Sequence, residues 1–338
     1  MPRVSAAQAS LRLEAVVTLD DWVRALAWSP DGLEVAAACA DGTVAAVDAD
    51  GQLRSLQRHD APATTVSWSS TGVLASGGED GRVLIDGTPH ELGAGWVEHV
   101  AWRPDGASLA AAHGRAVHVL GADGASLGVS AEFPATVACL DWHPRGVELA
   151  AGSYGGVHLL RGKDARTVRR LKWKGSVLAI AISPDGLRLA HGNQDASVHF
   201  WDLRRGSELE MWGYTTKVRQ LAWRHDGRFL ATGGGTAITI WNFAGRGPAG
   251  TRPQELDHHT EPITWLGFQP RSRLLASTAQ DGFAALWKPG SDDLPLAVVA
   301  VDDELTTAAW SPDGNRLALG GANGSVAIAR AERKEDDA

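Results

Sequence analysis

Two almost identical segments, LAWSPDG at residues 26–32 and AAWSPDG at residues 308–314, lie near opposite ends of this 338-residue chain. Weaker copies of the same pattern lie between them, which gives eight copies in all. The third residue of each copy is aromatic or aliphatic and stands at position 28, 68, 102, 142, 182, 223, 268 or 310. A spacing near 40 residues that is sustained along a chain predicts an array of repeats or a closed ring of repeats.

Every copy belongs to the same succession of local signals. A short alternating run such as VRALAWS (23–29) is followed by a turn rich in Pro, Asp and Gly. An apolar run such as LEVAAAC (33–39) then leads to an Asx–Gly pair, which is a strong hairpin signal. A third run such as SVHFWDL (197–203) and a weaker fourth such as QLRSLQ (52–57) complete the unit. The pattern predicts an all-β fold with four short antiparallel strands per unit.

These units resemble the blades of WD-repeat (WD40) β-propellers over residues 11–330, and VHFWD at 198–202 is similar to the family's signature. In the family, a His, a Ser and an Asp of a blade form hydrogen bonds with the Trp of that signature. One unit matches all four positions of this structural tetrad, with His259, Ser277, Asp281 and Trp287. A second unit has His59, Ser76 and Asp80, but Asp86 stands in place of the Trp.

The repeat count predicts a propeller of eight blades, with seven as the alternative if one weak unit is distorted. The last unit has no apolar fourth run, and the N-terminal run LRLEAVVTL (11–19) has no unit before it. The resemblance implies that this N-terminal run is the missing strand of the last blade, which closes the ring without an exposed sheet edge. Residues 1–10 are then an N-terminal extension and residues 331–338 a charged C-terminal tail.

The tryptophan of the repeated motif is expected in the core and not in a binding site. Two copies carry Ile182 and Phe268 at the same position. A position that accepts Trp, Phe or Ile fills space between packed sheets. The six tryptophans concerned are Trp28, Trp68, Trp102, Trp142, Trp223 and Trp310.

Composition restricts the classes of partner and compartment. Lys and Arg number 32 and Asp and Glu number 40, so the net charge is −8. Because phosphate affinity depends on clustered Lys and Arg, we expect neither nucleic acid nor an acidic membrane surface as a partner. Cys39 and Cys139 are too few for a disulfide framework, which favours a reducing cytoplasm. No apolar run suits a signal peptide or a membrane span.

The sequence contains none of the motifs for a catalytic nucleophile, a phosphate loop or a dinucleotide site, so we expect no enzyme activity and no cofactor. His118, His158 and His199 stand at one place in the third run of three successive units. Equivalent positions of neighbouring blades are too far apart to share a zinc ion, whose ligands lie at about 2.1 Å. His113 and His191, near the second turns, are the weaker candidates for a zinc or small-ligand site, which is the alternative function.

The predicted function is a non-catalytic scaffold that binds a protein or peptide of unknown identity. The resemblance implies that partners dock on the end of the propeller that carries the approach to each first strand, and on the mouth of the channel. Trp, Tyr and Arg, which dominate interface hot spots, are frequent there. The residues expected on this partner-binding face are Trp22, Arg24, Glu79, Trp96, Glu98, Tyr154, Trp173, Lys174, Gln194, Tyr214, Lys217, Arg219 and Gln280.

Overall fold

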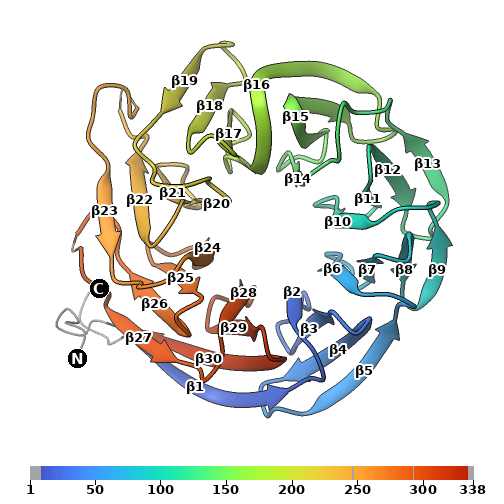
Figure 1. Cartoon of the computed structure of the whole chain (residues 1–338), viewed down its shortest axis with the longest axis horizontal. Helices are drawn as coiled ribbons and strands as arrows, with labels where there is room; N and C mark the ends of the chain where they lie inside the picture. The colour runs from blue at the N-terminus through green and yellow to red at the C-terminus, as the bar shows by residue number, and fades with distance from the viewer. Residues whose placement is uncertain (1–8, 246, 292, 334–338) are drawn as a thin grey trace.

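The computed structural model describes residues 9–245, 247–291 and 293–333. These residues contain thirty β-strands and no helix, and the strands form a ring of antiparallel sheets about a central axis (Figure 1). The prediction of an all-β propeller with four-stranded antiparallel blades is therefore confirmed. Within the same residues there is no helix that could cross a membrane.

Six sheets contain four strands each. Their strands follow one another outward from the axis, except that the last sheet takes its outermost strand from the start of the chain (Figure 1). The six sheets are β2 (Val23–Trp28), β3 (Glu34–Cys39), β4 (Thr43–Asp48) and β5 (Leu53–Arg58); β6 (Ala63–Trp68), β7 (Leu74–Gly78), β8 (Arg82–Ile85) and β9 (Thr88–Glu91); β10 (Val97–Trp102), β11 (Ser108–His113), β12 (Ala116–Gly121) and β13 (Ser126–Val129); β20 (Gln220–Trp223), β21 (Phe229–Gly233), β22 (Ala237–Asn242) and β23 (Gln254–Asp257); β24 (Ile263–Phe268), β25 (Leu275–Ala279), β26 (Phe283–Trp287) and β27 (Ala297–Ala300); and β28 (Leu305–Trp310), β29 (Arg316–Gly321) and β30 (Ser325–Arg333) with β1 (Ala9–Thr18).

The seventh sheet has six strands because two of its strands are unusually long. Its strands are β14 (Cys139–Trp142), β15 (Glu148–Arg161), β16 (Thr167–Ile182), β17 (Arg188–Asn193), β18 (Val198–Asp202) and β19 (Glu208–Met211). The first half of β15 pairs with β14 and its second half pairs with β16. Gly155 and Gly156, with φ of 90° and 125°, lie between the two halves. The Gly162 N–H donates to the Val147 carbonyl at 3.0 Å, so the two ends of β15 lie side by side.

The first and the last described strands, β1 and β30, lie in one sheet. β1 pairs antiparallel with β30, from Ala9 opposite Arg333 to Thr18 opposite Ser325. β1 and β30 thus extend beyond the boundaries of 11 and 330 expected from the sequence. The rest of the predicted extension and tail, residues 1–8 and 334–338, lies outside the described residues.

The repeated tryptophan is a contact between neighbouring sheets, as expected for a core residue. Trp28 is 7% exposed, and its indole N–H donates to the Ala309 carbonyl of the preceding sheet at 2.9 Å. Trp102, Trp142, Trp223 and Trp310 make the corresponding bond to the carbonyls of Ser67, Ala101, Ala181 and Gly267. Each bond satisfies a polar group that burial would otherwise leave unpaired. Five of the six motif tryptophans thus form the same joint between sheets, whereas the indole N–H of Trp68 is buried without a hydrogen-bond partner among the described residues.

Candidate partner-binding face

One end of the ring carries the segments that enter the innermost strands, together with the turns between second and third strands, and is called the upper face below. Six innermost strands have a β-bulge directly after the first residue that pairs with the second strand. A bulge changes the direction in which a side chain points. The entering segments are 19–22, 59–62, 93–96, 133–136, 173–176, 214–217, 259–262 and 301–304. The bulged residues are Arg24, Thr64, Glu98, Leu178, Thr264 and Thr306.

Arg24 is central to the first group of predicted residues. Its guanidinium donates to Glu79 Oε1 at 2.7 Å and lies over the Trp22 ring at 5.3 Å from the ring centroid. Burial raises the pKa of the Glu98 carboxyl, and Arg24 opposes this rise while Glu79 adds to it. The structure therefore brings Trp22, Arg24, Glu79 and Glu98 together in one charged group. Trp22 itself is 41% exposed.

Several other predicted residues are exposed on the upper face without forming a second charged group. Trp96 is 50% exposed and Tyr154 is 55% exposed. Lys217 and Arg219 are exposed at the entry to β20, and Gln194 and Gln280 are exposed at turns. These side chains are accessible to a partner and are not held in a preformed site.

Tyr214 belongs to the interior of its sheet more than to the surface. Its hydroxyl lies 2.7 Å from Thr232 Oγ1 and accepts a hydrogen bond from Trp241 Nε1 at 2.8 Å. Burial raises the pKa of Tyr214 to about 12. Both polar contacts of the hydroxyl are internal, so this side chain holds the entering segment of β20 in place.

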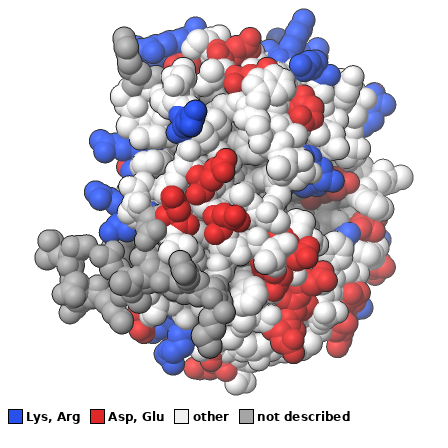
Figure 2. Space-filling view, turned by 60° about the vertical axis from the view of Figure 1, so that its left-hand side comes forward, with Lys and Arg blue, Asp and Glu red and all other residues white. Residues whose placement is uncertain are grey.

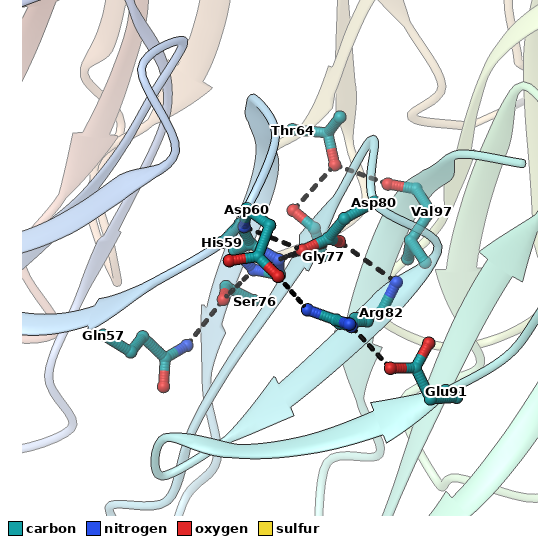
Figure 3. Close-up of polar contacts among 10 residues, drawn as sticks. All are labelled: Gln57, His59, Asp60, Thr64, Ser76, Gly77, Asp80, Arg82, Glu91 and Val97. Atoms are coloured by element: carbon teal, nitrogen blue, oxygen red, sulfur yellow. Dashed lines mark hydrogen bonds and ion pairs between the residues drawn. The ribbon is translucent and has the colours of Figure 1, made fainter.

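The structural tetrad is formed. His259 Nε2 lies 2.8 Å from Ser277 Oγ, Trp287 Nε1 donates to the same oxygen at 2.9 Å, and Asp281 Oδ2 lies 3.0 Å from His259 Nδ1. Figure 3 shows the second unit, where His59 bridges Ser76 and Asp80 in the same way. There Gln57 Nε2 donates to Ser76 Oγ at 2.5 Å in place of the missing tryptophan.

Trp173 and His191 occupy the tetrad positions of the sheet that contains β17. Trp173 stands four residues before Val177, as His259 stands four residues before Ile263. His191 lies opposite Ile180 across the strand pair, as Ser277 lies opposite Leu266. Trp173 stacks on His199 with centroids 4.5 Å apart, and Trp201 and His191 meet His199 edge-on. These four rings, Trp173, His191, His199 and Trp201, are called the aromatic cluster below.

The histidines of the alternative prediction are held by neighbours within the fold. His191 Nδ1 lies 2.8 Å from Asn193 Oδ1, and its Nε2 lies 3.2 Å from His199 Nδ1. His158 stacks on Phe133, and His113 meets His118 edge-on. Within the described part of the chain, no three His, Cys, Asp or Glu side chains are grouped so that they could hold a metal ion.

Charge is unevenly distributed over the entering segments. The segments that enter β2, β6, β24 and β28 carry exposed acidic residues: Asp20, Asp21, Asp60, Glu261, Asp302 and Glu304. The segments that lead to the second half of β16 and to β20 carry exposed lysines, Lys174 and Lys217. Figure 2 shows carboxylates gathered in groups on the part of the surface that it displays, with Lys and Arg more towards its edge. The face therefore presents a negative arc and a smaller positive one.

A family model described as WD domain, G-beta repeat matches five segments, residues 14–46, 51–85, 166–202, 207–242 and 250–288. Together these segments make up more than half of the chain. The chain belongs to the WD40 family. This confirms the resemblance inferred from the repeats, and WD40 propellers are in general non-catalytic and bind proteins.

Curated relatives share only part of their length with this WD40 chain. THO complex subunit 3 of Arabidopsis thaliana is 29% identical over 121 residues, which are 35% of this chain and 38% of that protein. Coronin-7 of Homo sapiens is 36% identical over 121 residues, which are 33% of this chain and 13% of that protein. The chain thus matches well under half the length of either relative.

A solved structure matches almost the whole chain. The crystal structure of the computationally designed Ika8 protein superposes with a TM-score of 0.78, covers 96% of this chain and 100% of its own, and is 20% identical. At this identity the likeness concerns the fold alone.

Sequence analysis missed three residues beside Trp173 and Lys174. Trp212 is 57% exposed, and the Lys174 ammonium lies 5.6 Å from its ring centroid. Glu208 and Glu210 alternate along β19 and therefore point to one side of it. The alternation ELEM at 208–211 is a visible signal, but nothing in the sequence says that β19 lies beside Trp173.

Proposed function

We propose that this chain is a non-catalytic scaffold that binds a protein or peptide partner through its upper face. The observation that carries the proposal is the contrast between two sets of tryptophans. Those of the repeated motif are buried or half-buried and largely donate to backbone carbonyls, whereas Trp22 and Trp96 are 41% and 50% exposed. Exposed indoles with nearby charged groups are typical of interface hot spots.

The test compares two double variants in partner capture from native cytosol. Trp22→Ala with Trp96→Ala removes the two exposed indoles of the upper face. Leu33→Ala with Val147→Ala removes two side chains that are 68% and 56% exposed at turns of the opposite end. We expect a partner that is retained by the wild type and by the Leu33/Val147 variant, and lost by the Trp22/Trp96 variant. Equal retention by all three folded proteins would contradict this assignment.

The accompanying proposals concern partner chemistry and compartment. The negative arc of Asp20, Asp21, Asp60 and its neighbours favours a partner with a positively charged docking segment. The net charge of −8 supports the expectation of neither nucleic acid nor an anionic membrane as a partner. Cys39 and Cys139 are buried and unpaired, which supports a reducing compartment such as the cytoplasm.

We also propose that the ring has eight blades. The hairpin-like return of β15, with Gly162 bonded to Val147, supports two middle strands in that one element. The first half of β16 then serves as the outer strand of one blade and its second half as the inner strand of the next. Divided in this way, the six-stranded sheet becomes two four-stranded blades, and β1 closes the ring. A density map viewed along the axis should show eight innermost strands, and seven would contradict the proposal.

A further inference from the structure

A hollow of about 490 Å³ lies beside the aromatic cluster. Its lining residues are Lys172, Trp173, Lys174, His199, Glu208, Leu209 and Glu210. They come from β18, from β19 and from the part of β16 that precedes its pairing with β17. The site thus combines an aromatic wall, two carboxylates and two ammonium groups.

The carboxylates of the hollow have unused capacity to accept hydrogen bonds. Glu210 lies opposite His199 and Glu208 lies opposite Trp201 in the β18–β19 ladder. Glu210 Oε1 is buried and has no hydrogen-bond partner among the described residues, and burial raises the pKa of this carboxyl. Glu208 Oε2 lies 3.7 Å from His199 Nε2. A buried acceptor without a donor is costly, so Glu210 is the part of the hollow that a ligand donor would satisfy.

The cation nearest to the aromatic wall does not satisfy these carboxylates. The Lys174 ammonium lies 5.5 Å from the Trp173 ring centroid and 5.6 Å from that of Trp212. Within the described residues, Lys174 forms no ion pair within 4.0 Å. The ammonium therefore lies near two indole rings and forms no hydrogen bond or ion pair with Glu210, although its charge opposes the rise that burial causes in the pKa of that carboxyl. Aromatic faces attract cations, so the position of Lys174 marks this part of the hollow as a place for a cationic group.

We propose that this hollow binds the guanidinium of an arginine side chain on a partner segment, and that Lys174 covers the aromatic part of the site in the free protein. The proposal rests on the proposed function, since it names the chemical group by which a partner is held. A guanidinium stacks on an indole while its planar fork donates to carboxylates, and it is less strongly hydrated than an ammonium. Trp173 and Trp212 would supply the faces, and Glu208 and Glu210 the acceptors.

The competing occupant is an anion held between Lys172 and Lys174. The two lysines and two glutamates of the lining balance in formal charge, so net charge does not choose between the two occupants. The position of the groups favours the cation, because the unsatisfied buried atom is the carboxylate oxygen Glu210 Oε1. Removing the Lys174 side chain should strengthen the binding of a cation and weaken the binding of an anion.

The test titrates a blocked pentapeptide, Gly-Gly-Arg-Gly-Gly, against protein labelled at the tryptophan indoles, with the citrulline peptide as its uncharged counterpart. Indole NMR signals report on Trp173 and Trp212, once single substitutions have assigned them. We expect saturable shifts of both signals with the arginine peptide and Kd weaker by about tenfold for the citrulline peptide, as for loss of a charge-assisted hydrogen-bonded pair.

Three variants separate the roles of the charged residues. Glu210→Gln should weaken arginine binding about tenfold, since it removes the charge that accepts the guanidinium. Glu255→Gln is the matched control, because Glu255 lies opposite Thr239 in the next sheet as Glu210 lies opposite His199. It should leave Kd unchanged. Lys174→Ala should tighten binding severalfold, because it removes both a competitor and a like charge.

Two results would overturn the proposal. One is the absence of saturable indole shifts in both the wild type and Lys174→Ala. The other is weaker binding by Lys174→Ala together with shifts caused by inorganic phosphate, which would assign the hollow to an anion. Circular dichroism is to establish first that each variant is folded. Failure here leaves the partner capture that depends on Trp22 and Trp96 intact, so it is distinguishable from failure of the proposed function.

Discussion

The sheet of β24–β27 and the sheet that contains β17–β19 solve the same packing problem in different ways. In the first, His259, Ser277 and Trp287 form a chain of hydrogen bonds that Asp281 completes. In the second, three rings of the aromatic cluster, Trp173, His191 and Trp201, stand at the positions of His259, Ser277 and Trp287. The indole nitrogens of Trp173 and Trp201 are buried without a hydrogen-bond partner among the described residues.

The difference between the two sheets shows that replacing the polar tetrad can leave polar groups available to a ligand. The polar tetrad uses all its donors internally and leaves nothing for a ligand. The aromatic cluster holds its entering segment by stacking, and the hollow beside it retains an unpaired carboxylate at Glu210. Loss of the tetrad in one sheet therefore coincides with a surface that has binding capacity. Because both sheets retain a tryptophan and an aspartate at matching positions, substitutions can compare them directly.

The largest expected effect is the loss of the buried tetrad tryptophan. Trp287 is fully buried and lies opposite Leu275, as Trp201 lies opposite Leu189. Trp287→Ala should lower the free energy of unfolding by about 3–5 kcal/mol, because it leaves a large cavity and removes a hydrogen bond. Trp201→Ala should cost clearly less, about 2 kcal/mol, since Trp201 is half-buried and its indole N–H is unpaired. Urea unfolding measures both, and equal costs would show that the tetrad bond adds nothing.

The aspartates give the second comparison. Asp281 accepts hydrogen bonds from the backbone N–H groups of Thr260 and Phe283 at 3.0 Å each, besides facing His259. Asp281→Ala should cost about 2–3 kcal/mol, because bonds to a charged acceptor are lost and buried donors remain. Asp195 accepts from Ser197 Oγ at 2.7 Å, and Asp195→Ala should cost less than about 1 kcal/mol. A larger loss for Asp195 than for Asp281 would reverse the comparison.

The third prediction concerns pH. Burial lowers the pKa of His191 to about 3, below the ordinary value of 6.5. The unfolded chain therefore binds the proton more readily, so stability is constant above about pH 6.5 and falls as the pH drops towards 3. Between pH 7.5 and 5, the wild type should lose about 2 kcal/mol through this residue.

Substitution identifies the residue responsible. His191→Ser should show a smaller loss between pH 7.5 and 5, measured by urea unfolding at each pH. His225→Ser, which changes an exposed histidine, should keep the loss of the wild type. An unchanged pH dependence in His191→Ser would assign the effect to other groups, such as His59 and His259, whose pKa values burial also lowers.

The fold could be predicted from the sequence because its signals are local and repeated. The repeated pattern appears eight times and six of its copies carry the motif tryptophan, so a single degraded copy such as IAISPDG at 180–186 does not hide the period. The complete tetrad, including His259 and Trp287, could be placed because the resemblance to WD40 blades implied its hydrogen bonds, and the structure contains them.

The candidate site depended on contacts that no repeat encodes. Tyr214 was expected on the surface because it lies in an entering segment, but its hydroxyl bonds inside the sheet to Thr232 and Trp241. Trp212 and Glu210 were missed because their importance depends on Lys174, which lies nearly 40 residues away. Pairing across strands brings such residues together, and one sequence does not show which side chains of neighbouring sheets will meet.

The smallest expected effect is the coupling energy between two substitutions that introduce the tetrad residues into the sheet of β17–β19. Trp173→His and His191→Ser would place the tetrad residues beside Asp195 and Trp201, which already stand at the matching positions. Each single change should destabilise, because it removes a stacked ring from the aromatic cluster. Together they should cost about 1 kcal/mol less than the sum of the single losses, since only the double variant can form the His–Ser and Trp–Ser bonds.

A double-mutant cycle in urea measures this coupling at pH 7.5. As a control, the pair Trp173→His and Ser277→Ala combines the first change with a residue of β25, which belongs to another sheet, and its costs should add. If the Trp173 and His191 changes also add, the two sheets differ in more than side-chain identity. The backbone of β16 would then be the cause, because it runs without a break from its pairing with β15 to its pairing with β17, whereas β24 starts afresh after a separate segment.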